Sequence, residues 1–132
     1  MTVDVLFLDA NVLFSAAYRT DARVRELWEL DDAELVTSAY AIEEAWRNLT
    51  RDDQLTDLVK LLKTIRVVPS LPTHVIPAGV RLPDKDRPIL LAALACGATY
   101  LLTGDLRHFG PLLGTELDGL RVRTPRAYLR NR

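Results

Sequence analysis

The sequence contains one cysteine, Cys96, so the chain cannot form a disulfide bond within itself. No apolar run approaches the roughly 20 residues that a membrane-spanning helix needs. The N-terminus carries Asp4 and Asp9 and has no basic region, which is unlike a secretory signal peptide. We therefore expect a cytoplasmic protein with no membrane anchor. At 132 residues, the chain is expected to form one domain, residues 1–132.

Several common catalytic signatures are also absent. The two histidines, His74 and His108, do not have the spacing of metal ligands, and there is no glycine-rich phosphate loop. The sequence has no Ser–His–Asp set and no reactive-cysteine pattern. These absences argue against a zinc site, a nucleotide-binding loop and a serine or cysteine hydrolase.

Neither sign of charge is in large excess, because the formal net charge is −1, and this gives no general indication of nucleic-acid binding. The charge is unevenly spread, however. Residues 119–132 contain no acid and five arginines, namely Arg121, Arg123, Arg126, Arg130 and Arg132. This segment is either a solvated, fraying tail or a surface that contacts phosphates, and the sequence leaves both open.

The apolar pattern alternates between strands and helices along the chain. Strands are expected to begin near residues 3, 34, 65, 99 and 121, and helices over 11–17, 22–30, 39–49, 52–64, 87–96 and 125–130. Residues 70–83 contain three prolines and are expected to form a loop. The alternation predicts a three-layer α/β protein whose central sheet is mainly parallel, with four or five strands. The last strand alternates in polarity, which is typical of a sheet edge.

Helix ends and core positions can also be predicted. Asp21, Ser38 and Asp86 stand where N-caps are expected, and Gly97 is expected to end the helix that follows Asp86. Trp28 and Trp46 fall on the apolar stripes of their helices, so both are expected in the core.

Acidic residues stand at the points where a ligand site is expected. Asp9 follows the first buried strand, and Asp105 follows the strand near residue 99. Ligand sites of open α/β sheets lie at the carboxyl ends of the strands. Asp86 begins the buried helix that precedes Asp105, and Glu44 can reach the same edge from helix 39–49. Asp9 alone would be read as a helix cap, but the recurrence of the pattern favours a cluster.

Carboxylates crowded in one cleft repel one another unless some are protonated or a cation lies among them. Oxygen ligands without histidine or cysteine indicate Mg²⁺ or Mn²⁺. Such an ion, open to substrate phosphates, supports phosphodiester hydrolysis. The acids alone do not settle the reaction, because receiver domains and haloacid-dehalogenase-type phosphatases also place Asp at strand ends. The phosphatases need a second Asp where this chain has Asn11, and receivers need paired acids at the first strand.

Four segments together resemble the PIN domain family, in the order of that family and at roughly its spacing. They are LDANVL at 8–13, the helix 38–49 with Glu44, DRPILLAAL at 86–94 and YLLTGD at 100–105. The ending TPRAYL at 124–129 resembles the closing helix of the family. Each motif is weak alone, but four in register form a specific match over nearly the whole chain.

The resemblance implies a PIN-like α/β/α fold and a Mg²⁺- or Mn²⁺-dependent endoribonuclease that hydrolyses RNA. Asp9, Glu44, Asp86 and Asp105 would be its catalytic and metal-binding acids, and Asn11 and Thr103 would be polar support. Glu43 competes with Glu44 for its place, and Asp84 competes with Asp86. The resemblance also implies a VapC-type toxin that forms a homodimer and is neutralised by a small antitoxin protein. The alternatives are an RNA-processing nuclease outside such a pair and a non-catalytic PIN-like binding module.

Arg107 and His108 directly follow the acidic turn at Asp105. They are candidates for contact with an RNA phosphate or for proton transfer. An exposed loop pair without function is the alternative interpretation, and it is favoured because position alone rarely identifies a general acid.

Overall fold

The computed structural model describes residues 3–69 and 75–132. Its centre is a sheet with the strand order β3-β2-β1-β4-β6-β5, in which only the β5–β6 pair is antiparallel among the pairings of the described residues. The strands are β1 (Asp4–Leu8), β2 (Ala33–Ser38), β3 (Arg66–Val68), β4 (Tyr100–Leu102), β5 (Glu116–Leu117) and β6 (Leu120–Arg123). The α/β class and the mainly parallel sheet are confirmed.

Two sequence predictions about the sheet are wrong. The sheet has six strands, whereas four or five were expected, because the two-residue strand β5 was missed. As a consequence β6 is not the edge, since β5 pairs with its outer side. A strand of two residues is too short to show a periodic pattern of its own.

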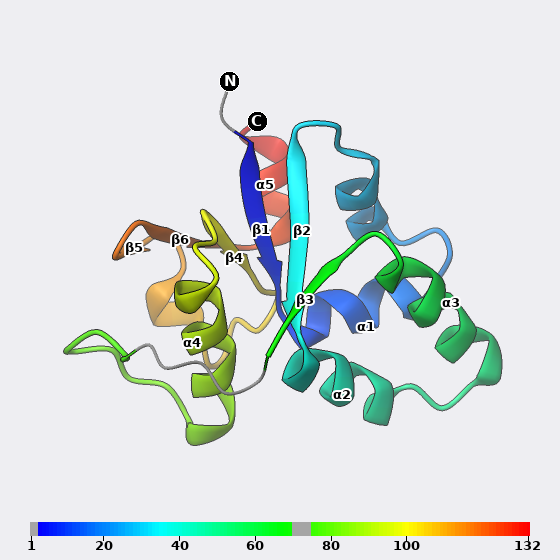
Figure 1. Ribbon diagram of the computed structural model, residues 1–132, viewed down its shortest axis with the longest axis horizontal. Helices are drawn as coiled ribbons and strands as arrows, with labels where there is room; N and C mark the ends of the chain where they lie inside the picture. The colour runs from blue at the N-terminus through cyan, green and yellow to red at the C-terminus, as the bar shows by residue number, and fades with distance from the viewer. Residues whose placement is uncertain (1–2, 70–74) are drawn as a thin grey trace.

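Helices flank the sheet on both sides (Figure 1). The α-helices are α1 (Ala10–Tyr18), α2 (Ala39–Asn48), α3 (Asp52–Leu62), α4 (Arg87–Ala95) and α5 (Pro125–Arg130), and the 3₁₀ helices are η1 (Arg23–Glu29), η2 (Asp84–Asp86) and η3 (Gly110–Leu112). Helix α4 packs on β2 and β4, whereas α1 packs against α2 and α3, and α5 against η1. Among the described residues, no helix has the length and apolar character needed to cross a membrane.

The core lies where the central strands meet these helices. Leu6, Phe7 and Leu8 of β1 and Leu101 and Leu102 of β4 are all fully buried. Such continuous burial is typical of parallel strands that are covered on both faces. The buried strands β1 and β4 therefore end side by side, at the edge where α1 begins.

Helix ends agree with the sequence in some places and not in others. Ser38 caps α2 by accepting a hydrogen bond from the backbone N–H of Ala41 at 3.1 Å, and Gly97, with φ of 73°, follows α4 as predicted. Asp21 is not a cap, because it pairs with Arg19 and η1 begins after Ala22. Asp86 precedes α4 but its side chain makes no capping hydrogen bond.

The two tryptophans that were expected in the core differ in their burial. Trp46 is 44% exposed, so its placement in the core is wrong. Helix α2 buries Ala41 and Ala45, and Trp46 lies one position beyond that stripe. Trp28 is partly buried, and its indole N–H donates to the backbone oxygen of Leu61 at 2.9 Å. The predicted loop at 70–83 is a loop over residues 75–83, and residues 70–74 lie outside the described part of the chain.

Candidate functional site

The site is built where β1 and β4 end together. The two strands are parallel neighbours, with Leu8 opposite Leu102. The backbone N–H of Asp9 donates to the carbonyl oxygen of Leu102 at 3.1 Å, which extends the pairing by one residue. Asp9 and Thr103, the residues that follow the two strands, are therefore brought side by side although 94 positions separate them.

The Asp9 carboxylate accepts three hydrogen bonds within the site. One of its carboxylate oxygens, Oδ2, accepts hydrogen bonds from the Thr103 hydroxyl at 2.8 Å and the Asn11 side-chain amide at 3.0 Å. The other oxygen, Oδ1, accepts from the backbone N–H of Ala10 at 2.6 Å. The pKa of Asp9 is raised to about 6, chiefly by burial. The charges of Asp86 and Glu44 add to the rise, and the hydrogen bonds from Thr103 and Ala10 oppose it.

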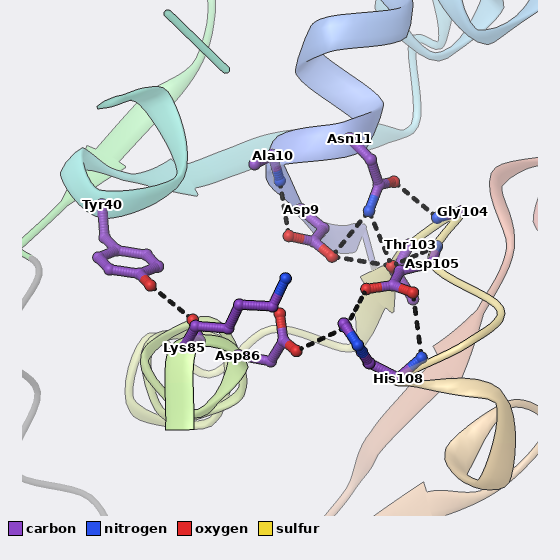
Figure 2. A network of polar contacts seen from close by, with 10 residues as sticks. All are labelled: Asp9, Ala10, Asn11, Tyr40, Lys85, Asp86, Thr103, Gly104, Asp105 and His108. Atoms are coloured by element: carbon purple, nitrogen blue, oxygen red, sulfur yellow. Dashed lines mark hydrogen bonds and ion pairs between the residues drawn. The ribbon is translucent and has the colours of Figure 1, made fainter. Parts of the chain in front are cut away.

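Asn11 and Thr103 hold the two strand ends in a fixed relationship (Figure 2). The Asn11 carbonyl oxygen accepts from the backbone N–H of Gly104 at 2.7 Å, so its amide nitrogen faces Asp9. The Thr103 hydroxyl oxygen also accepts from the backbone N–H of Asp105 at 3.0 Å. A Cβ at Gly104 would approach the Asn11 carbonyl oxygen to 3.2 Å, so a side chain at this position would require Asn11 to shift by a few tenths of an ångström.

Asp86 enters the site from η2, at the start of α4. The residue is only 7% exposed, and its Oδ2 atom has no hydrogen-bond partner among the described residues. Burial raises the pKa of Asp86, and nearby charges act in both directions. The Tyr40 hydroxyl of α2 donates to the backbone oxygen of Lys85 at 2.6 Å, which ties the segment bearing Asp86 to the helix bearing Glu44 (Figure 2).

His108 lies between two of the acids (Figure 2). Its Nδ1 atom is 3.0 Å from Asp86 Oδ2 and 3.0 Å from Asp105 Oδ2. Its backbone N–H also donates to Asp105 Oδ1 at 3.0 Å. The expectation of an exposed loop pair is therefore wrong for His108, which is half-buried, whereas Arg107 is exposed.

The structure brings all four acids named from the sequence to one pocket of about 500 Å³, lined by Asp9, Glu44, Asp86 and Asp105 together with Ala10, Asn11, Phe14, Ala45, Asn48 and Lys85. Glu43 and Asp84, the competing acids, are exposed and do not line it. Thr103 is fully buried and supports the pocket from beneath Asp9. The pocket thus receives acids from the ends of β1 and β4, from α2 and from η2.

The chemistry of this pocket fits a divalent cation. Four carboxylates face one space, and the pKa of Asp9 and of Asp86 is raised because their charges are desolvated. Asp86 Oδ2 is a buried acceptor that forms no hydrogen bond among the described residues, although His108 Nδ1 lies 3.0 Å away, and such atoms carry a free-energy cost unless an ion or a donor satisfies them. Carboxylate and amide oxygens are the ligands that Mg²⁺ and Mn²⁺ take in proteins.

A second and larger pocket of about 720 Å³ adjoins the first, and both share Asn11. Its lining includes Arg23 of η1 and Arg126 and Arg130 of α5. Within the described part of the chain, none of these three side chains forms an ion pair or hydrogen bond. Of the two alternatives left open for the C-terminal arginines, the fraying tail does not hold for α5, which is the helix expected at 125–130 and has Tyr128 buried against the core.

Two features of the site were missed in the sequence. His108 was considered for substrate contact and not as a neighbour of two acids, although it follows Asp105 by only three residues. Arg23 was not considered, because nothing in the local pattern relates η1 to α5. The contact between η1 and α5 depends on the order of strands in the sheet, which periodicity does not reveal.

A family model for the PIN domain matches residues 5–107 of this sequence. The chain belongs to the PIN domain family. The match confirms the resemblance and includes the four acids that line the first pocket. A comparison with curated proteins finds no match.

Solved structures share the fold of this PIN domain at low sequence identity. VapBC2 from Rickettsia felis, bound to a DNA fragment from its promoter, aligns with a TM-score of 0.65 and 14% identity, covering 91% of this chain and 98% of that one. VapC20 of Mycobacterium tuberculosis, a toxin that cleaves the sarcin-ricin loop, gives 0.54 and 16%, covering 76% and 91%. VapBC-1 from nontypeable Haemophilus influenzae gives 0.57 and 16%, covering 92% and 98%.

Proposed function

We propose that this PIN domain is a divalent-metal-dependent endoribonuclease that hydrolyses RNA phosphodiester bonds. One observation carries the proposal: Asp9, Glu44, Asp86 and Asp105 line a single pocket. Acids drawn from four separate elements do not converge for stability, because each added charge raises the free energy of the others. Membership of a family of nucleases and the likeness to a toxin that cleaves the sarcin-ricin loop support the same reaction.

In this proposal Asp9, Glu44, Asp86 and Asp105 hold Mg²⁺ or Mn²⁺. A cation bound there supplies positive charge against the phosphate oxygens and makes water a better nucleophile. Thr103 and Asn11 orient the Asp9 carboxylate through the hydrogen bonds at 2.8 and 3.0 Å. These two residues are positioning residues, because each acts through Asp9.

The RNA backbone would continue from the acidic pocket into the pocket lined by Arg23, Arg126 and Arg130. Both pockets share Asn11, so the acids and the arginines line adjoining surfaces that one RNA strand could occupy. Guanidinium groups bind phosphates through paired hydrogen bonds. The proposal thus gives Arg126 and Arg130 the phosphate-contacting role that was one of the two alternatives for the C-terminal segment. Arg107 is a further candidate contact, because it is exposed beside the acidic turn.

The test is cleavage of RNA by the purified chain in the presence of Mg²⁺ or Mn²⁺, after chelation, and after the ion is restored. We expect cleavage only with the ion present and a loss of about 100-fold or more for Asp105→Asn. Asp118→Asn is a matched control with the same loss of charge, because Asp118 is exposed in the β5–β6 turn and has a φ of 50° that asparagine accepts. Cleavage that survives chelation would overturn the proposal.

The biological role that we propose is that of a VapC-type toxin, cytoplasmic, homodimeric and neutralised by a small antitoxin protein. The support is the likeness in fold between this chain and one chain in each of the structures of VapBC2 and VapBC-1. An antitoxin that inserts an arginine or lysine among the four acids would replace the charge of the cation.

This role is tested by producing the chain in a bacterial host. Growth should stop on induction of the wild type and continue on induction of Asp105→Asn. Co-expression of the protein encoded by a neighbouring reading frame should restore growth and yield a stable complex. Normal growth with active wild-type nuclease in the cell would contradict the toxin role and leave the nuclease proposal standing.

A further inference from the structure

The four acids of the pocket are not equally available to a cation. Asp9 already accepts three hydrogen bonds, from Ala10, Asn11 and Thr103. Asp86 Oδ2, in contrast, is buried and has no hydrogen-bond partner among the described residues. The negative charge on the Asp86 and Asp105 side of the pocket is therefore less compensated by hydrogen bonds than the charge of Asp9.

His108 is the side chain that lies beside these two carboxylates. Its Nδ1 is 3.0 Å from an oxygen of each carboxylate, yet one N–H can satisfy only one of them at this geometry. The contact with Asp105 Oδ2 has hydrogen-bond geometry, whereas Asp86 Oδ2 lies at the same distance from Nδ1 without forming a hydrogen bond. A proton on Nδ1 therefore does not fully compensate the negative charge of Asp86 and Asp105.

We propose that His108 is a metal ligand, and that Asp86, Asp105 and His108 form a mixed nitrogen–oxygen site that favours Mn²⁺ over Mg²⁺. The inference rests on the proposed function only for the expectation that a divalent cation binds this pocket. One oxygen of each carboxylate and Nδ1 lie within 4.8 Å of one another. The half-buried imidazole is held toward the acids by the bond from its backbone N–H to Asp105 at 3.0 Å.

The spacing of the ligand atoms supports this assignment. An octahedral ion with ligands at about 2.1 Å holds adjacent ligand atoms about 3 Å apart. The two distances from His108 Nδ1 to the carboxylate oxygens are both 3.0 Å. An ion bound at Nδ1 would take the place of the hydrogen there. The Nδ1 proton would pass to solvent, and the neutral ring would keep a single proton on Nε2, taken from solvent if the ring began as the Nδ1–H tautomer.

The nature of the ligands sets the preference between ions. Mg²⁺ takes oxygen ligands almost entirely, whereas first-row transition ions also accept the imidazole nitrogen. A site with only carboxylates would discriminate little between Mg²⁺ and Mn²⁺. A nitrogen ligand strengthens Mn²⁺ binding selectively, so the ratio of the two affinities depends on His108.

The experiment is pulsed electron paramagnetic resonance of the metal-free full chain after addition of one equivalent of Mn²⁺, without RNA. We expect the modulation of a directly bound ¹⁴N nucleus in the wild type, and its replacement when the histidines are labelled with ¹⁵N. His108→Gln should remove the nitrogen signal. His74→Gln is the matched control, because the chain has two histidines, and it should retain the signal.

A competition titration provides the second readout. His108→Gln is expected to weaken Mn²⁺ binding about tenfold or more and to leave Mg²⁺ affinity within about twofold. If His108 only orients Asp105 by a hydrogen bond, both affinities fall together and no nitrogen modulation appears. That outcome, or Mn²⁺ bound to the wild type without a nitrogen signal, or no Mn²⁺ binding, overturns the inference.

The two proposals fail separately in these measurements. A nitrogen-bound Mn²⁺ in a chain that does not cut RNA would overturn the proposed function and leave the metal site standing. RNA cleavage with Mn²⁺ but without nitrogen coupling would overturn only the role of His108. The labelled wild type needs no substitution, so its result does not depend on the folding of a variant.

Discussion

The hydroxyl of Thr103 donates a hydrogen bond of 2.8 Å to the carboxylate of Asp9, and this bond joins the ends of β1 and β4. Both residues are buried. The same hydroxyl oxygen accepts from the backbone N–H of Asp105. The Thr103 side chain therefore contacts the carboxylate of Asp9 and the backbone of Asp105. A neutral, fully buried residue therefore links Asp9 to the turn that carries Asp105.

Replacing this hydroxyl should impair catalysis through Asp9. We expect Thr103→Val to cost about 1–3 kcal/mol of unfolding free energy, because the Asp9 oxygen and the Asp105 N–H lose a partner. We also expect RNA cleavage to fall about 10- to 100-fold, as for residues that support metal ligands. Chemical unfolding and initial cleavage rates measure the two effects.

Thr37→Val is the matched control for this variant. Thr37 is also fully buried, and its hydroxyl donates to the backbone oxygen of Leu8 at 2.8 Å without contacting a carboxylate. It should lose stability and retain cleavage. Equal losses of activity in both variants would show that Thr103 has no special role.

The raised pKa of Asp9 predicts a pH dependence of stability in the metal-free protein. Its pKa is about 6 when folded and 3.8 as a free group, so the folded chain binds more protons between these values. The free energy of unfolding should therefore fall as pH rises from about 4 to about 6, by about 3 kcal/mol from this group. Unfolding in urea at a series of pH values measures it.

Asp9→Asn is the control for this dependence, because an amide does not titrate. The fall over the same pH interval should shrink in the variant, although Asp86, whose pKa is also raised, still contributes in the same direction. An unchanged profile would mean that Asp9 is ionised without cost in the folded chain, contrary to its burial.

The arginines of the second pocket predict a salt dependence of RNA binding. Each phosphate contact that is lost should lower the slope of log affinity against log salt by about 0.7 for single-stranded RNA. The double variant Arg126→Ala, Arg130→Ala should therefore bind RNA more weakly and with a slope smaller by about 1.4. Fluorescence anisotropy with a short RNA, at several salt concentrations, provides the measurement.

Arg121→Ala serves as the comparison from the same C-terminal segment. Its guanidinium lies 3.2 Å from Glu116 on β5 and does not line the second pocket. Its removal should leave the slope unchanged. If the Arg121 variant and the double variant behave alike, the effect is one of net charge and the pocket has no part in binding.

A stability prediction concerns the start of β1 and the last helix. The Tyr128 hydroxyl donates to Asp4 Oδ2 at 2.6 Å and accepts from Arg132, and Arg132 also pairs with Asp32. Burial raises the pKa of Tyr128, and the hydrogen bond to Asp4 adds to the rise. Tyr128→Phe should lower the unfolding free energy by about 1–2 kcal/mol and leave cleavage unchanged.

Thermal and urea unfolding of this variant, with RNA cleavage measured in parallel, test that expectation. A loss of cleavage in a folded Tyr128→Phe chain would mean that α5 positions the active pocket more directly than its contacts indicate.

The acids could be placed from the sequence because the rule that places them is topological. Asp9 and Asp105 follow buried strands, and the carboxyl ends of parallel strands share one edge. Their meeting requires only that β1 and β4 be neighbours, which they are. Glu44 could be separated from Glu43 only with the help of the family pattern, because helical period left both at the border of the stripe.

Other features depend on tertiary contacts that a sequence pattern does not contain. Trp46 is a large apolar residue of a type common in cores. It is nevertheless exposed, because the packing surface of α2 runs through Ala41 and Ala45. Asp86 stands at a cap position, but it faces the pocket and makes no capping bond. His108 reaches Asp86 across 22 positions, and no local spacing indicates that contact.

The central claim is that Asp9, Glu44, Asp86 and Asp105 act as one cation-dependent nuclease site. Its most direct test is the initial rate of RNA cleavage by Asp9→Asn at saturating Mn²⁺, with folding verified by circular dichroism and thermal unfolding. We predict a folded variant whose rate falls about 100-fold or more below that of the wild type. A folded Asp9→Asn chain that cuts RNA as fast as the wild type would contradict the account.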